Sequence, residues 1–230
     1  MALACATVGI VVGVVSATGL GLKLASGIVG IAQGNMLATL LLTMVAALIL
    51  GTGLPTSATY IITSIMAAPA LVELGMPKLA AHMFVFYFGI LADLTPPTAI
   101  STYATSSIAG ADVWKTQWMG MMLALSGFII PFSFAYDPAL LLVNATLPHI
   151  VLRTAAAALG IVMLGAGLIG YFRTPTRLWE RAALLGGALL LIFPGAVSGA
   201  IGAACFVAVW LAQGVSSRRT APAPELSIRP

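Results

Sequence analysis

Several apolar runs of roughly membrane-spanning length contain no ionisable side chain, and this feature restricts the folds open to the chain more than any other. Hydrophobic residues fill 60% of the 230 positions and charged residues only 7%, whereas an ordinary soluble domain has about 25% charged residues. A water-exposed surface would need more charge, because large apolar patches drive association. Roughly 20 helical residues cross a hydrocarbon core about 30 Å thick. We therefore expect an all-α membrane protein.

The net charge of +4 comes from few residues, most of which lie between apolar runs or near the carboxy terminus. A nucleic-acid partner would require a basic face, and the sequence offers none. The basic residues are better interpreted as flanking charges that orient helices in the membrane. Their distribution slightly favours a cytoplasmic position for Lys115 and for the segment containing Arg173, Arg177 and Arg181.

Two apolar segments, residues 36–50 and 58–74, are short for a membrane crossing and flank a break at residues 51–57 with the sequence GTGLPTS. Two half-length helices around such a Gly/Pro break predict a re-entrant helical hairpin, which enters and leaves the membrane by the same face.

A second break, DLTPPT at residues 93–98, separates the apolar segments 79–92 and 99–109. Together the two segments are long enough to cross the membrane, so they predict one broken transmembrane helix. The prolines remove amide donors and prevent the helix from reconnecting. Thr95 is expected to cap the second segment, with Pro96 at its first helical position, and the carbonyls of residues 89–92 are expected to lose their helical partners.

The remaining runs predict ordinary transmembrane helices at residues 3–22, 118–134 and 149–172, with connections at 23–35 and 110–117. Residues 182–211 are long for one helix, and Pro194 in their middle allows two short ones. The chain thus divides into a transport unit at 1–147, additional transmembrane helices at 148–212 and a disordered tail at 213–230. Glycines in the apolar runs are expected at close helix contacts, namely Gly9, Gly13, Gly165, Gly167, Gly170, Gly195 and Gly199.

The two breaks carry the chemistry that the sequence offers. Irregular backbone survives at membrane depth only where it is buried in protein or faces a wet cavity, and half-helix ends there supply fixed partial charges. Carbonyls before each break suit a cation, and amides after Pro55 suit an anionic group. The expected substrate-binding residues are Pro55, Thr56 and Ser57. The expected ion-binding residues are Gly51, Thr52, Gly53, Gly89, Asp93, Thr95, Pro96, Pro97 and Thr98, with the Ser101 hydroxyl nearby. The alternative is a proline kink repaired by water and neighbouring helices.

Asp93 is the carboxylate that lies near the middle of an apolar segment, about 21 Å along the helix from Leu79 at 1.5 Å per residue. An intramembrane carboxylate is a functional hypothesis by default. It could bind a cation or carry a proton. The alternative is that it lies in the wet mouth of the break and caps the following turn.

These motifs resemble the large membrane subunit of TRAP (tripartite ATP-independent periplasmic) transporters, and most closely the fused permeases that work with TAXI-type binding proteins. The resemblance rests on LGTGLPTS at 50–57, LAAHMFVFYFG at 79–89 and LTPPT at 94–98, and extends over residues 7–142. It implies an elevator-type transporter of two inverted repeats, of which this chain resembles only the carboxy-terminal one.

The resemblance also implies the function and the partners. The function would be symport of organic anions such as carboxylates across a bacterial or archaeal cytoplasmic membrane, driven by Na⁺ or H⁺, with no other cofactor. The partners would be the lipid bilayer, an amino-terminal permease half, a small membrane subunit or its fused equivalent, and a periplasmic solute-binding protein. Asp93 stands where the resemblance leads us to expect a small or apolar residue, which leaves the coupling ion, Na⁺ or H⁺, open.

Two other functional classes compete with a permease. The chain could be a membrane scaffold or assembly protein that uses only its small-residue helix faces, or a truncated, inactive permease fragment. An enzyme is not expected, because the sequence holds no recognisable constellation of nucleophile, base and oxyanion donors.

Overall fold

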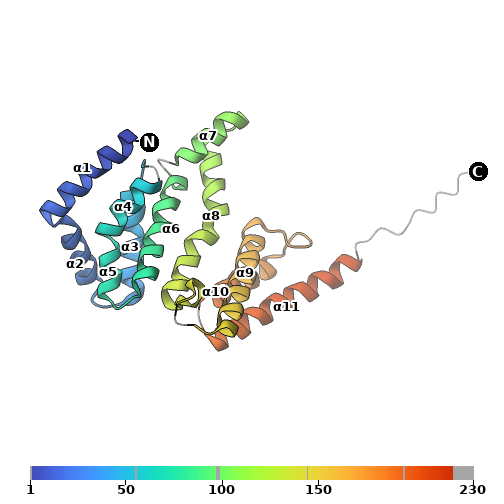
Figure 1. Ribbon diagram of the computed structural model, residues 1–230. Coiled ribbons are helices and arrows are strands. Elements are labelled where there is room, and N and C mark those ends of the chain that lie inside the picture. Colours follow the sequence, from blue (N-terminus) through green and yellow to red (C-terminus); the bar gives the residue numbers. More distant parts are fainter. Residues whose placement is uncertain (1, 55, 97–98, 144, 194, 220–230) are drawn as a thin grey trace, which may run out of the picture. The chain divides into compact units, whose positions relative to one another are not determined.

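The computed structural model describes residues 2–54, 56–96, 99–143, 145–193 and 195–219. The chain forms two compact units, Met1–Ile150 (unit 1) and Val151–Pro230 (unit 2), drawn in Figure 1. Regular structure in the described residues is helical apart from one isolated bridge between Tyr171 and Pro175, which confirms the predicted all-α class.

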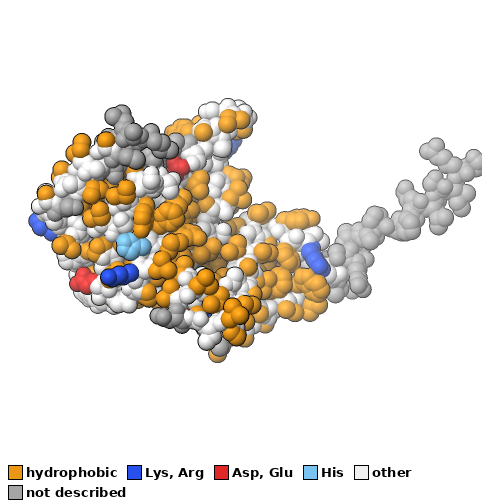
Figure 2. Space-filling model, viewed as in Figure 1, with side chains coloured by type: hydrophobic (Ala, Val, Ile, Leu, Met, Phe, Trp, Pro, Cys, Tyr) orange, Lys and Arg blue, Asp and Glu red, His pale blue; other side chains and the backbone are white. Residues whose placement is uncertain are grey.

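Three helices in the described part of the chain are long and apolar enough to cross a membrane, within Val113–Tyr136, Leu147–Ile169 and Val197–Gly214. Hydrophobic side chains cover much of the face shown in Figure 2. Such a surface suits lipid as the solvent, because soluble proteins rarely expose apolar patches of this extent.

The amino-terminal helix of unit 1 is interrupted where the sequence predicted one continuous span. Helix α1 (Ala2–Thr18) ends before Gly19, and α2 (Leu20–Ala32) follows directly. Gly19 has a left-handed backbone with φ 64°, a conformation that glycine adopts without steric cost, and the helix axis bends there by 63°. The prediction of one helix at 3–22 followed by a connection is therefore wrong.

The predicted helical hairpin is present. Helix α3 (Met36–Gly51) begins at Asn35, whose side chain accepts a hydrogen bond from the Ala38 amide at 3.1 Å. Helix α4 (Thr56–Met66) packs beside α3, and α5 (Ala68–Glu73) continues the second arm after an interruption at Ala67. Neither α3 nor α4 has the length of a full membrane span.

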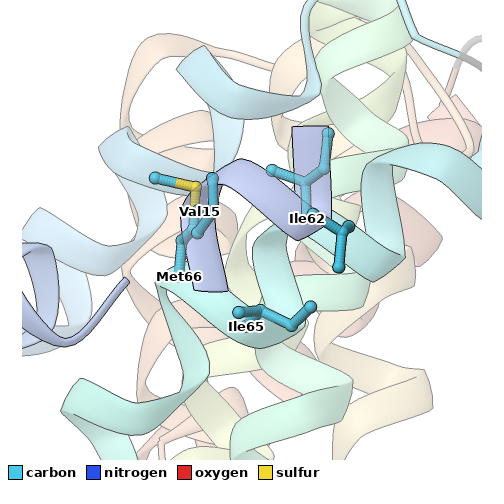
Figure 3. A pocket seen from close by; sticks show the side chains of 5 residues that line it. Val15, Ile62, Ile65 and Met66 are labelled. Atoms are coloured by element: carbon cyan, nitrogen blue, oxygen red, sulfur yellow. The ribbon is translucent and has the colours of Figure 1, made fainter. Parts of the chain in front are cut away.

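Helix α1 covers the outer face of this hairpin. Val12 and Val15 of α1 and Ile62, Ile65 and Met66 of α4 line a small apolar pocket (Figure 3). Helix α2 also packs against the hairpin, because its Gly21 approaches so closely that an added Cβ would lie 2.9 Å from the Ile65 carbonyl oxygen. The hairpin is thus supported by two helices that precede it in sequence.

The predicted broken helix is also present, although its second segment begins later than expected. Helix α6 (Lys78–Leu91) passes into the short 3₁₀ helix η1 (Ala92–Leu94), and α7 (Ile100–Ala109) resumes after the break. The N-cap position of α7 is Ala99, so the prediction that Thr95 caps this helix is wrong. The Thr95 hydroxyl instead donates to the Leu91 carbonyl at 2.8 Å, because it lies one turn after that residue.

The last long helix of unit 1 starts earlier than predicted. Helix α8 (Val113–Tyr136) includes most of the residues expected to form a polar linker. The Asp112 carboxylate accepts the Lys115 amide at 2.8 Å and stabilises the helix start in the usual manner of an N-cap. The 3₁₀ helix η2 (Pro138–Leu141) follows.

Unit 2 is built from α9 (Leu147–Ile169), which begins in the last residues of unit 1, and from α10 (Leu178–Ile192) and α11 (Ala196–Arg219). The run at 182–211 thus divides into two helices around residue 194, as the proline allowed. Helix α11 continues through residues 213–219, which the sequence assigned to a disordered tail. The reason is tertiary, since the polar side chain of Gln213 is fully buried within this unit.

Only some of the glycines predicted at helix contacts occupy them. A Cβ on Gly167 would lie 2.8 Å from Leu185, which confirms close packing there. The prediction is wrong for the other six glycines. A Cβ added to Gly9, Gly13, Gly165 or Gly199 would have no neighbouring atom within 4 Å, and one added to Gly170 would have its nearest neighbours 3.8 Å away. A Cβ on Gly195 would contact only Ser198, three residues later in the chain. The close contacts of unit 2 use Gly160, Gly187 and Gly202 instead. Which helix face meets a neighbour depends on tertiary packing, and glycine spacing does not specify it.

Candidate functional site

The tip of the hairpin lies directly against the break of the broken helix. Gly51 is the last residue of α3 and is buried. A Cβ on Gly51 would lie 2.8 Å from the Cβ of Ala92 and 2.9 Å from the carbonyl oxygen of Gly89. Glycine is required here because any side chain would separate the two backbones. We call this arrangement the tip–break contact.

Thr59 of α4 is the third member of the tip–break contact. If Gly51 and Gly89 each carried a Cβ atom, those atoms would lie 2.9 and 2.8 Å from the methyl carbon of Thr59. Its hydroxyl donates a long 3.4 Å hydrogen bond to the Leu54 carbonyl in the hairpin turn. Sequence reasoning missed this residue. The available signal was a threonine one turn into the second arm, but its glycine partners could not be identified without the fold.

The break satisfies part of its own freed backbone. The Leu91 carbonyl accepts the Thr95 hydroxyl, and the Ala92 carbonyl accepts the Thr95 amide at 3.2 Å. Neither bond is an α-helical amide bond, since the first comes from a side chain and the second spans three residues, so these two carbonyls have found substitutes for the helical partners they were expected to lose. A carbonyl oxygen has two lone pairs, so each can still accept a second interaction.

Asp93 lies in η1 and is half-buried. Its Oδ2 accepts a hydrogen bond from the hydroxyl of Ser101, in the first turn of α7. The carboxylate thus links the two segments of the broken helix across the break. Of the hydroxyls expected near the ion, that of Ser101 bonds Asp93 and that of Thr95 bonds the Leu91 carbonyl.

The other predicted site residues line the exposed side of the hairpin turn or fall outside the described residues. Thr52 and Gly53 are exposed, and the Thr52 hydroxyl donates to the Ile49 carbonyl at 2.7 Å. Thr56 and Ser57 are exposed at the start of α4, and Pro96 is half-buried beside the break. Pro55, Pro97 and Thr98 lie outside the described residues.

Aromatic contacts hold α6 in place on both sides. The Tyr60 hydroxyl of α4 lies 3.2 Å from His82 Nδ1 of α6. On the other side, Phe84 and Phe88 pack edge-to-face against Phe132 of α8, with ring centroids 5.4 and 5.9 Å apart. These contacts fix the helix that carries Gly89 and the break.

The oxygen donors gathered at the tip and the break are main-chain carbonyls, threonine and serine hydroxyls and one carboxylate. This donor set suits a hard cation. No group of three or more His, Cys, Asp or Glu side chains arranged to hold a metal occurs within the described ranges.

Unit 1 therefore has the features of one class of protein: a polytopic membrane protein in which a helical hairpin meets a broken helix. The family model described as "Tripartite ATP-independent periplasmic transporter, DctM component" matches residues 1–150. The chain belongs to this family, the large permease component of TRAP transporters, which confirms the resemblance seen in the sequence. No curated protein and no solved structure matches the chain significantly. The family match ends where unit 1 ends, so residues 151–230 lie outside it.

Proposed function

We propose that the tip–break contact is half of the binding core through which a TRAP transporter takes up an organic anion, such as a carboxylate, together with a coupling ion. The observation that carries this proposal is the approach of Gly51 to Gly89 and Ala92. It brings the two irregular backbone segments of unit 1 together. Irregular backbone at membrane depth is tolerated where it lines a cavity, and transporters place their sites there.

The coupling ion is assigned to the break. Asp93 and Ser101 supply a carboxylate and a hydroxyl from the two sides of the break. The carbonyls near Gly51 and Gly89 would supply further oxygens. The remaining ion-binding residues of the proposal are Thr52, Gly53, Thr95, Pro96, Pro97 and Thr98. A carboxylate in this setting serves Na⁺ by direct coordination and H⁺ by protonation. The dependence of uptake on each gradient distinguishes the two ions.

The anionic group of the substrate is assigned to the start of α4, at Pro55, Thr56 and Ser57. Thr56 and Ser57 are exposed there, and the first amides of a helix attract negative charge. Cation and anion would then bind at opposite ends of one short contact.

The complete transporter is expected to need further parts. These are a second hairpin-and-break repeat (the amino-terminal permease half), a small membrane subunit or its fused equivalent, and a periplasmic solute-binding protein. The assembly would operate in the cytoplasmic membrane of a bacterium or archaeon.

The test uses the reconstituted transporter containing this chain and measures uptake of a labelled organic acid. Asp93→Asn removes the negative charge and Thr95→Val removes the hydroxyl bonded to the Leu91 carbonyl. Each should lower uptake about tenfold or more, since an interaction with a charged group contributes roughly 1.5–3 kcal/mol and a buried polar group left unsatisfied costs roughly 1–3 kcal/mol. Glu73→Gln is the matched control, because Glu73 is exposed at the end of α5. Unchanged uptake by the Asp93 and Thr95 variants, with normal membrane insertion, would remove both residues from the site.

A further inference from the structure

The turn between α9 and α10, residues 170–177, presents basic side chains at one end of unit 2. Arg173 and Arg177 lie in this turn and Arg181 follows in α10. No acidic side chain lies within ion-pair distance of these three arginines in the part of the chain that the structure describes. The turn directly follows α9, one of the helices long enough to span a membrane. These charges are therefore placed at a membrane surface.

The nearby carboxylate is engaged by amides instead of guanidinium groups. Glu180 is only 5% exposed, and its Oε2 accepts the Arg177 main-chain amide at 3.0 Å and Gln213 Nε2 at 2.9 Å. The other end of the Gln213 side chain accepts the Arg173 amide at 3.0 Å. The turn is thus fixed to α10 and α11 by its backbone, and its arginine side chains keep their positive charge without an acidic partner.

Each arginine occupies a different position around the turn. Arg181 donates to the carbonyls of Gly167 and Leu168 at 2.6 and 2.5 Å and closes the end of α9. The Arg173 guanidinium lies over the Trp210 ring, 4.5 Å from its centroid. Arg177 is exposed at the N-cap of α10. Arg173 and Arg177 therefore remain available to an anion.

Exposed apolar and aromatic side chains surround these two arginines in sequence and space. Tyr171 and Trp179 are 55% and 52% exposed, and Leu178, next to Arg177, is 88% exposed. Figure 2 shows basic side chains bordered by hydrophobic ones near the end of α11. Tyrosine and tryptophan collect at the level of lipid headgroups, where one end of the ring is wet.

We propose that this turn is a binding site for the phosphate group of an anionic phospholipid. Arg173 and Arg177 would bind the phosphate oxygens, which match the planar donor fork of a guanidinium. Trp179 and Tyr171 would lie at headgroup depth and Leu178 among the acyl chains. Charge complementarity selects an anionic over a zwitterionic lipid, since a basic residue near the surface attracts anionic lipid. The site lies outside the family match and is independent of the transport function.

The experiment titrates the detergent-solubilised full chain with phosphatidylglycerol and counts bound lipid by native mass spectrometry. Wild type should bind phosphatidylglycerol at least about tenfold more tightly than phosphatidylcholine with the same acyl chains, and Arg173→Gln/Arg177→Gln should lose this preference. The control Lys23→Gln/Lys78→Gln makes the same charge change at exposed positions in unit 1 and should keep it.

Three results would overturn the proposal. The first is equal binding of the two lipids to wild type. The second is full retention of the preference by the arginine variant. The third is displacement of phosphatidylglycerol by inorganic phosphate at the same concentration, which would indicate a site for free anions. If the double variant fails to fold, Arg177→Gln alone decides, because Arg177 does not share the ring contact of Arg173 with Trp210.

Discussion

Both units of this chain contain breaks between apolar helices, but the backbone at the helix ends is packed and hydrogen-bonded differently in each unit. In unit 1, Gly51 and Gly89 bring backbone close to backbone, and the Thr59 methyl group and the Ala92 Cβ pack against them. In unit 2, long polar side chains cover the helix ends. Arg181 bonds the last carbonyls of α9, and Arg153 donates to the Ile192 carbonyl, near the end of α10, at 3.2 Å.

Both solutions answer the same requirement, that backbone polar groups at membrane depth find partners. They differ in the groups used. Guanidinium groups bond carbonyls at the helix ends of unit 2, whereas the tip–break contact of unit 1 is packed by glycine backbone, the Thr59 methyl group and Ala92, all of them buried.

The strongest test of this difference is Gly51→Ala. The new Cβ would have to displace the Gly89 carbonyl oxygen, now 2.9 Å away, and the Ala92 Cβ. Uptake should fall about 100-fold, because displacement of a binding group by about 1 Å has effects of that order. Gly30→Ala, at an open position of α2, is the matched control. Uptake by Gly51→Ala within twofold of wild type would contradict the assigned role of the tip–break contact.

The corresponding test in unit 2 is Gln213→Leu. The substitution removes the side-chain oxygen that accepts the Arg173 and Thr174 amides, and the side-chain NH₂ group that donates to the Glu180 carboxylate. The free energy of unfolding should fall by about 2 kcal/mol, the cost of leaving buried polar groups unsatisfied. Hydrogen exchange should accelerate at residues 173 and 174. Amides of α3 and α4 serve as the internal reference, and their acceleration to the same extent would show that the two units are not separate in stability.

A smaller effect is expected from substitutions that distinguish the methyl group of Thr59 from its hydroxyl group. Thr59→Ser removes the methyl group that contacts Gly51 and Gly89 and should lower uptake about tenfold, since a buried methyl contributes roughly 1 kcal/mol and its loss leaves a gap. Thr59→Val keeps the methyl group and removes only the 3.4 Å hydroxyl contact, which is weak at that length. Its uptake should stay within about threefold of wild type. The opposite ranking would assign the role to the hydroxyl.

The parts of the fold that depend on local chemistry could be predicted from the sequence. The two breaks, at residues 51–57 and 93–98, are both present. The first contains glycines and a proline and the second two adjacent prolines, and such residues interrupt helices through local chemistry. The Asp112 N-cap is equally local, but the polar residues that follow it resemble a linker, so the sequence predicts a later start for α8 than the structure shows. Gly19 could not be recognised as a break, because an isolated glycine inside an apolar run is also tolerated within a helix.

The candidate site was predictable only as two separate segments. Which glycine meets which backbone, and that Thr59 lies between them, follows from how α4 packs on α6. The same limit explains Gln213, whose polar surroundings in sequence predicted disorder. A tertiary contact buries it against Glu180 and the backbone of the turn.

The tip–break contact also constrains how the protein can move. With Gly51, Gly89 and Thr59 at van der Waals distance, no layer of water or acyl chain fits between the hairpin and the broken helix. A hairpin that opened alone would have to expose these backbones to solvent. We therefore expect α3, α4 and α6 to travel as one body, with the flexing confined to joints outside it, such as the left-handed Gly19 between α1 and α2.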